Sequence, residues 1–402
     1  MANSSTNSLA STPNKAKRLR LVLTLSVSVL VVASACQVTA DAPGDELTSL
    51  PASAVAVLAV GIEAEPTPRP ASTYIIAFDA AGKVVGSKTG ALMYSPMVYA
   101  SKDRVVATTG DAVYEFTTGG MQKVSINENM GQAGAIDETT GTSTLWFNTA
   151  KPDGPATGYR NDYVVADNSA GPSQLTHGRF EGYVRSVSQC GDRAYVVAED
   201  INSPRRVPTR ATNGFFTTTR GTRPTLLRTW EQSIEVSPVS RRGVCWKRGG
   251  MMVNLFSYPP ATSASEASAV LTLVSNDLRT GMSTEKPVTV PGRVGAAMRD
   301  TLTLHNDRLY WINTAGEMLS VAADGSEGTV RFEWSIPDAR QARIANVGNG
   351  IVAVVTKDST PRYIEYSLVD GRTLRTVPLA WLPKTLTSFY SAEVLSVAAI
   401  PR

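Results

Sequence analysis

The sequence contains few of the residues from which catalytic and metal sites are usually built. Only two histidines occur in 402 residues, His177 and His305, each in a short polar stretch that reads as a turn. No group of His, Cys and carboxylate residues has metal-ligand spacing, and no Asp-x-Asp-x-Asp loop indicates calcium. No Gly-x-Ser-x-Gly or Walker A sequence occurs, because Val85–Gly90 lacks the required spacing. We therefore expect no metal, no cofactor and no catalytic residues.

Charged residues are also scarce, at 18% of the chain, while Ser, Thr, Gly and Pro are plentiful. This composition suits an exported, turn-rich all-β protein better than a helical cytosolic one. Lys and Arg total 39 against 35 acidic residues, but four of the basic residues lie in the first 35 positions, where no acidic residue occurs. Without that segment the chain holds 35 residues of each sign, so its charge gives no reason to expect nucleic acid binding.

The N-terminus has the three parts of a secretory signal peptide. An apolar run, Leu21–Val32, ends in the small residues Ala33-Ser34-Ala35, and four basic residues precede it: Lys15, Lys17, Arg18 and Arg20. The run is about a dozen residues long, whereas a spanning helix needs about 20. We expect residues 1–35 to be removed, and an uncleaved anchor is the alternative.

The residues around the expected cleavage site, Ala33–Cys36, resemble the lipobox of bacterial lipoproteins. In that family the cysteine is acylated, gains a diacylglycerol and becomes the new N-terminus. The sequence departs from the pattern at Ala33, where a larger aliphatic residue is usual, and an ordinary signal peptidase would also accept Ala-x-Ala. The resemblance implies lipidation of Cys36, a tether over residues 36–50, and a location on the outer face of the bacterial cytoplasmic membrane.

The chain has three cysteines, and lipidation of Cys36 would leave Cys190 and Cys245 as a pair. An exported protein meets an oxidising environment in which such a pair can form a disulfide. The two occupy comparable places in the segments SQCGDRAYVV and GVCWKRGGMMV, so adjacent repeats can bring them together. Two separately buried thiols are the alternative.

One hairpin unit recurs along the chain from residue 51 onward. Ile351–Val377 has a β-branched run, a polar turn, an alternating strand, an Asp-Gly turn and a last short strand, and Ala54–Val85 has the same layout. Gly and Asp suit such tight turns because Gly tolerates positive φ. Further turns of this kind lie at Asp79–Gly82, Thr117–Gly120, Asp167–Gly171, Asp277–Gly281, Ala323–Gly325 and Val369–Gly371. Their glycines are 38 to 51 residues apart, except for one gap of 110, which fits two units if a turn lies in Leu226–Val236.

Seven such units predict an all-β fold, a seven-bladed β-propeller of four-stranded antiparallel blades over residues 51–402. The matching segments Trp146–Ala150 (WFNTA) and Trp311–Ala315 (WINTA) are 165 residues apart, about three units, and are expected in second strands. We interpret the tryptophans as core residues between blades. Thr385–Ile400 is expected to supply the inner strand or strands of the blade begun by Ala54–Val85 and so close the ring. We expect a monomer.

The turn DLRTG at 277–281 resembles the Asp-x-x-Thr-Gly turn of quinoprotein-like repeats in the wider WD40-like propeller superfamily. DETTG at 137–141 has the same letters but precedes WFNTA, so we expect it between the first and second strands of its blade. The WD40 signature is missing, and so is the adjacent cysteine pair of quinone-dependent dehydrogenases. The resemblance therefore implies an architecture and no activity.

The stretch Pro204–Arg248 is strongly basic, with ten Lys and Arg residues against Glu231 and Glu235. Ile201–Arg223 also lengthens its unit, and long loops on rigid scaffolds often carry binding sites. Guanidinium groups fork onto phosphate and carboxylate, and a pair of phenylalanines here can form an exposed apolar tip. The binding candidates are Arg205, Arg206, Arg210, Phe215, Phe216, Arg220 and Arg223. A solvated insertion without a specific role is the alternative.

These features favour a non-catalytic binding or scaffolding function, in which the chain binds an envelope protein or an anionic envelope component. The alternative is a carbohydrate-active hydrolase or lyase with carboxylates at the mouth of the central channel. Acidic, Tyr or Arg side chains converging at one mouth would favour the enzyme. A featureless mouth beside a projecting basic loop would favour the binding protein.

Overall fold

A computed structural model of the chain describes residues 43–401, except 63–71, 129, 150–159, 169–173, 200–209, 220–221, 234–236, 247–249, 258–269, 292–297, 299–300, 340–341 and 389–391. Within the unit Ala40–Arg402, the described elements are β-strands apart from one short helix. No helix in the described part of the chain is long and apolar enough to cross a membrane. The signal peptide and Cys36 lie outside the described residues.

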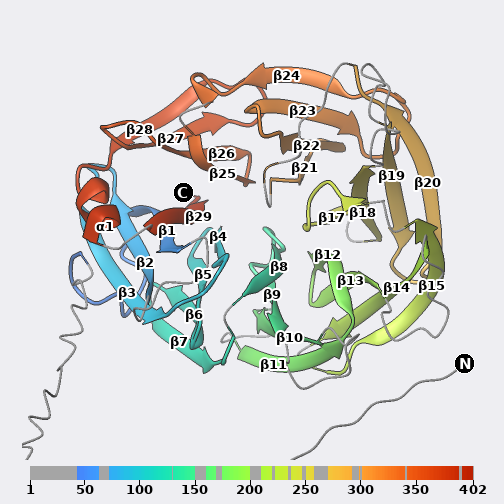
Figure 1. The fold of residues 1–402 in the computed structure, drawn as a ribbon, viewed down its shortest axis with the longest axis horizontal. Coiled ribbons are helices and arrows are strands. Elements are labelled where there is room, and N and C mark those ends of the chain that lie inside the picture. Colours follow the sequence, from blue (N-terminus) through green and yellow to red (C-terminus); the bar gives the residue numbers. More distant parts are fainter. Residues whose placement is uncertain are drawn as a thin grey trace, which may run out of the picture. The chain divides into compact units, whose positions relative to one another are not determined.

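The strands form seven antiparallel sheets arranged as the blades of a ring (Figure 1). We number the blades along the chain and give their strands from the centre of the ring outward. Blade 1 consists of β29 (Ala392–Ala399), β1 (Ala54–Ile62), β2 (Ser72–Asp79) and β3 (Val84–Ala91). Blade 2 consists of β4 (Val98–Ser101), β5 (Arg104–Thr109), β6 (Ala112–Thr117) and β7 (Gly120–Ser125). Blade 3 consists of β8 (Gly131–Ile136), β9 (Ser143–Thr149), β10 (Arg160–Asp167) and β11 (Gln174–Glu181). Blade 4 consists of β12 (Tyr183–Cys190), β13 (Arg193–Glu199), β14 (Arg210–Thr219) and β15 (Thr225–Ser233).

Blade 5 differs from the others because two short strands, β16 (Ser237–Pro238) and β17 (Val244–Trp246), both pair with β18 (Met251–Ser257). It continues with β19 (Val270–Asp277) and β20 (Ser283–Thr289). Blade 6 consists of β21 (Thr303–His305), β22 (Arg308–Ile312), β23 (Glu317–Ala322) and β24 (Arg331–Ser335). Blade 7 consists of β25 (Ala342–Gly348), β26 (Ile351–Thr356), β27 (Arg362–Ser367) and β28 (Thr373–Pro378). The expected seven four-stranded blades are therefore confirmed, with a divided inner strand in one of them.

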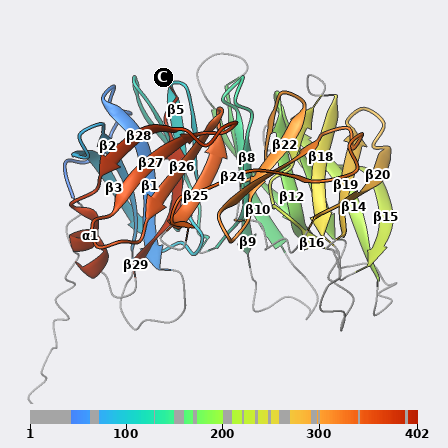
Figure 2. The ribbon, with the colours of Figure 1, turned by 90° about the horizontal axis from the view of Figure 1, so that it is seen from above.

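The hydrophobic core lies between neighbouring blades. Inner and middle strands such as β1 (AVAVLAVGI) are continuous apolar runs because a blade packs against neighbours on both of its faces. Trp146 in β9 and Trp311 in β22 are fully buried in second strands, as expected. Trp146 stacks on Tyr163 with ring centroids 4.4 Å apart and meets the edge of Phe180. Figure 2 shows inner strands such as β8 and β12 running across the thickness of the ring.

The outer hairpin turns of blades 1, 2, 5, 6 and 7 lie where the sequence predicts them. The turn expected at Asp167–Gly171 falls mostly outside the described residues. His177 lies within β11 and not in a turn, contrary to expectation. Gly82, Gly281 and Gly371 have φ of 80°, 71° and 67° in the turns of blades 1, 5 and 7. The prediction of a turn within Leu226–Val236 in blade 4 is wrong, because β15 spans Thr225–Ser233 and pairs with β14 along its length. The turn of blade 4 lies just before β15, where the amide of Thr222 donates to the carbonyl of Thr219.

The two ends of the propeller meet in blade 1. Strand β29 pairs with β1 from Ala56–Ala399 to Ile62–Ala392 and closes the ring as expected. It is preceded by a short helix, α1 (Leu382–Ser388). At the other end, the buried side chains of Leu47 and Leu50 pack in the core between blades 1 and 2. The packed part of the chain thus begins before Pro51, within the stretch expected to be a tether.

Candidate functional site

The inner strand of blade 5 leaves its own sheet between β16 and β17. There the segment Arg241–Gly243, which we call the inner bulge, bonds to the middle of β12 in blade 4. The amide of Val187 donates to the carbonyl of Arg241 at 2.9 Å, and the amide of Gly243 donates to the carbonyl of Val187 at 2.8 Å. A Cβ at Gly243 would lie 2.4 Å from Oδ1 of Asn254, so any larger residue here would displace that side chain.

The two arginines of the inner bulge extend to blades that do not adjoin blade 5. Arg241 donates from Nη1 to the carbonyl of Gln132 in blade 3, at 2.9 Å. Arg242 donates from Nη1 to the carbonyl of Val347 in blade 7, at 3.2 Å, and its Nη2 lies 3.5 Å from Oε1 of Glu138. Arg242 is only 5% exposed. At the inner bulge, these two arginine side chains of blade 5 therefore reach across the centre of the ring.

Glu138 and Asn349 complete these contacts between distant blades. The amide of Asn349 donates to Oε2 of Glu138 at 2.9 Å, and its side-chain amide donates to the carbonyl of Ala100 in blade 2 at 3.4 Å. Asn349 has φ of 53°, a left-handed conformation that asparagine tolerates better than most residues. The carboxylate of Glu138 is therefore held from two sides, by a backbone amide and by Arg242.

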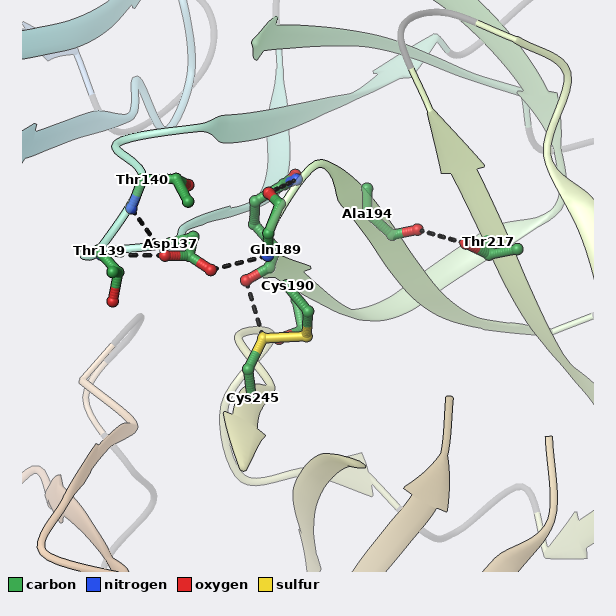
Figure 3. The surroundings of a disulfide bond; sticks show 10 residues. Asp137, Thr139, Thr140, Gln189, Cys190, Ala194, Thr217 and Cys245 are labelled. Carbon is green, nitrogen blue, oxygen red and sulfur yellow. Dashed lines mark hydrogen bonds between the residues drawn. A yellow bond between two sulfur atoms is a disulfide. The ribbon is translucent and has the colours of Figure 1, made fainter. Parts of the chain in front are cut away.

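Asp137 organises the turn between β8 and β9 and also contacts blade 4 (Figure 3). Its Oδ1 accepts hydrogen bonds from the amides of Thr139 and Thr140, at 2.9 and 3.0 Å, and its Oδ2 accepts one from Gly191 at 2.7 Å. In DLRTG, Asp277 likewise accepts from the amides of residues 279 and 280. Asp-x-x-Thr-Gly thus forms one local turn at two positions, and DETTG lies between first and second strands as expected.

Cys190 and Cys245 form the expected disulfide, which joins the end of β12 to β17 (Figure 3). Their Cα atoms are 5.6 Å apart, and the bond closes a sequence separation of 55 residues. The hydroxyl oxygen of Ser188 lies 3.2 Å from Sγ of Cys245. Because Cys245 follows the inner bulge by two residues, the disulfide fastens the bulge to blade 4 covalently.

The mouth of the channel is polar, but its carboxylates already have partners. It contains an open depression of about 580 Å³, including space shared with solvent, which is lined by residues such as Thr139, Ser188, Gln189 and Arg242. Asp137 accepts three backbone N–H bonds, and Glu138 accepts one and faces a guanidinium. The Oε1 atom of Glu138 accepts no hydrogen bond among the described residues and has only the guanidinium of Arg242 beside it, at 3.5 Å. Among the described residues, no group of three or more His, Cys, Asp and Glu side chains can hold a metal ion.

The basic residues chosen as binding candidates are described only in part. Arg205, Arg206 and Arg220 lie outside the described residues, and so does the side chain of Arg210, the first residue of β14. Arg223 is exposed just before β15. Two other residues of the basic stretch, Arg241 and Arg242, belong to the inner bulge. They were missed as central residues because nothing in the local sequence distinguishes them from the other basic residues of the stretch.

The expected apolar tip at Phe215 and Phe216 is wrong. Both residues lie in the middle of β14, where they pair with Val197 and Val196 of β13. Successive residues of a strand point to opposite faces, so Phe215 packs toward blade 5 and Phe216 packs toward blade 3. Phe215 is 0% exposed, and the ring of Phe216 meets Phe180 edge-on at 4.8 Å.

Comparison with known proteins adds information about the fold only. No protein-family description matches the sequence, and no curated protein matches it. Apo AztD from Citrobacter koseri is similar, with 11% identity, a TM-score of 0.44, and coverage of 86% of this chain and 98% of that chain. A lignostilbene dioxygenase from Pseudomonas brassicacearum has 10% identity, a TM-score of 0.47 and coverage of 88% and 94%. BamB from Moraxella catarrhalis has 11% identity, a TM-score of 0.36 and coverage of 70% and 71%. Likenesses this distant say nothing about activity.

Proposed function

We propose that this protein is an exported, lipid-anchored propeller that binds envelope proteins or anionic envelope components without catalysis. The observation that carries the proposal is the set of polar contacts between distant blades at the centre of the ring. Arg241 and Arg242 connect blade 5 to blades 3 and 7, and the disulfide fixes the segment that carries them. Because these contacts at the centre support the ring, a ligand binds on the faces or the rim of the ring.

The Cys190–Cys245 bond supports the proposed export. Disulfides form and persist in oxidising compartments and are rare in the cytosol. With this pair bonded, Cys36 is the one remaining cysteine, at the position where the lipobox resemblance implies acylation. A diacylglycerol there would hold the ring at the outer face of the cytoplasmic membrane, because stable anchoring takes more than one acyl chain.

The basic stretch is the proposed binding surface. Within it, Arg223 and Arg228 are exposed near or on the outer strand of blade 4. Guanidinium groups suit carboxylate and phosphate, which are abundant on acidic proteins, anionic polymers and lipid head groups. The proposal no longer includes Phe215 and Phe216, since both are core residues.

The binding role is tested by cross-linking on intact bacteria that express the protein, followed by mass spectrometry of what is captured. The test variant replaces Arg205, Arg206 and Arg210 with Gln. The control variant replaces the exposed arginines Arg193, Arg279 and Arg372 with Gln, so both variants lose the same charge. We expect loss of captured partners in the test variant only. Equal capture by both variants contradicts the role of the basic stretch, and glycan fragments without protein would support the carbohydrate-active alternative.

The anchor is tested separately. Cells are supplied with a labelled fatty acid, and the wild type is compared with Cys36→Ser. We expect label in the wild-type protein and its retention in the membrane fraction, and loss of both in the variant. An unlabelled wild-type protein that is released from the cells would show cleavage by an ordinary signal peptidase.

A further inference from the structure

Residues 43–50, which we call the N-terminal strap, run along the outer edge of blade 1 before the first strand begins. Glu46 pairs with Ser87 of β3 in a parallel bridge. The amide of Leu47 donates to the carbonyl of Ser87 at 2.7 Å, and the amide of Ser87 donates to the carbonyl of Asp45 at 2.8 Å. The strap therefore pairs with an outer edge that the four strands of blade 1 leave open.

The N-terminal strap is also held by its side chains and by blade 2. Leu47 and Leu50 are only 2% and 5% exposed and pack in the core between blades 1 and 2. The amide of Leu50 donates to the carbonyl of Thr117, the last residue of β6, at 2.8 Å. Lys88 on β3 forms an ion pair with Glu46. These contacts fix the place where the chain enters the ring, at the outer rim of blades 1 and 2.

The N-terminal strap shortens the connection between the ring and the proposed lipid anchor. Pro43, its first residue, follows Cys36 by seven positions. Fully extended, a chain of that length spans at most about 25 Å. If the strap were not bound, the connection would run to Ala54, where β1 begins, and would span about 60 Å. A folded part of roughly 350 residues is about 50 Å across, so only the unbound connection could reach around it.

The basic stretch lies across the ring from the N-terminal strap. In a ring of seven blades, blade 5 is opposite the boundary between blades 1 and 2. Figure 1 shows β15 and β20 on one side of the ring and β3 and β7 on the other. A ring about 50 Å across, held at the strap by at most about 25 Å of chain, cannot turn the rim of blade 5 toward an anchoring membrane.

We propose that the N-terminal strap orients the ring, with the rim of blades 1 and 2 facing the lipid surface of the membrane and the basic stretch facing away from it. This inference rests on the lipid anchor at Cys36 proposed above. It also narrows the proposed binding role. The lipid head groups of the anchoring membrane lie under the opposite rim, so they are not the ligand of the basic stretch.

The test measures energy transfer from a fluorescent amino acid in the full-length lipoprotein to a head-group-labelled lipid in vesicles of phosphatidylethanolamine and phosphatidylglycerol. The fluorescent residue replaces either Gln122 on β7 or Thr284 on β20, which are both exposed on outer strands. We expect transfer to be at least about twofold higher from position 122. Inserting about twenty Gly and Ser residues after Val38 lets the ring turn and should abolish the difference. The same residues added after Arg402 are the matched control and should preserve it.

The outcomes separate this inference from the anchor on which it rests. A protein that does not stay with the vesicles contradicts the anchor, and the inference with it. In a protein that stays with the vesicles, equal transfer from the two positions, or higher transfer from position 284, overturns the inference and leaves the anchor in place. A difference that survives the insertion after Val38 would show that the short connection is not its cause, and so also contradicts the role of the strap.

Discussion

The guanidinium of Arg242 in blade 5 donates to the carbonyl oxygen of Val347 in blade 7, past the intervening blade 6. The same side chain faces Glu138 in blade 3, so one buried arginine connects three blades. A buried charge is tolerated only when it is paired and hydrogen-bonded, and these contacts meet that condition. The centre of the ring is thus held by polar contacts, whereas its blades are held to their neighbours by apolar packing.

Replacing Arg242 with Met should destabilise the propeller by about 1–3 kcal/mol, the usual cost of leaving a buried hydrogen-bond partner unsatisfied, because the carboxylate left behind, Glu138, is partly exposed. Glu138 would keep its bond from Asn349 but would lose the positive charge beside it. The measurement is the free energy of unfolding in urea. Arg279→Met, at an exposed arginine, is the control and should change it by less than about 0.5 kcal/mol. Equal effects of the two substitutions would contradict a supporting role for Arg242.

Removing the disulfide by the double change Cys190→Ser and Cys245→Ser should cost about 4 kcal/mol, given the 55-residue separation that the bond closes. A reducing agent should lower the melting temperature of the wild type to that of the double variant and leave the variant unchanged. Cys36→Ser controls for the loss of a cysteine and should keep the wild-type melting temperature. A wild type that is insensitive to reduction would contradict the bond.

Much of the fold could be predicted from local signals in the sequence. Tight turns depend on one or two residues, and the glycines with positive φ at 82, 281 and 371 are visible as Asp- and Gly-containing segments. Strands that pack between blades have continuous apolar runs, which identify β1 and β26. The turn of blade 4 was missed because the sequence between β14 and β15 lacks the Asp-Gly pattern of the other turns.

The site could not be predicted in the same way because it depends on residues far apart in the chain. Arg242 is one of ten basic residues in its stretch, and no local pattern shows that it is buried while Arg223 is exposed. That difference arises because the inner strand of blade 5 divides and pairs with Val187.

Gly371→Ala should destabilise the protein more than Gly350→Ala, although both glycines have positive φ, at 67° and 71°. The left-handed conformation costs each alanine about 1–2 kcal/mol. At Gly371 the new Cβ would also lie 2.5 Å from the ring of Trp334, which adds about 1–3 kcal/mol, whereas nothing lies near Gly350. Unfolding in urea measures the difference. Equal losses would mean that this turn does not pack on blade 6.

Phe215→Ala should lower the free energy of unfolding by about 3–5 kcal/mol, because it removes a fully buried ring from the core between blades 4 and 5. Phe332→Ala is the matched control: its ring is 57% exposed on β24, so its loss should cost about 0.5 kcal/mol or less. If Phe215 were instead an exposed binding tip, Phe215→Ala would reduce partner capture and leave the free energy of unfolding unchanged. Urea unfolding and the cross-linking assay, run on both variants, separate these outcomes.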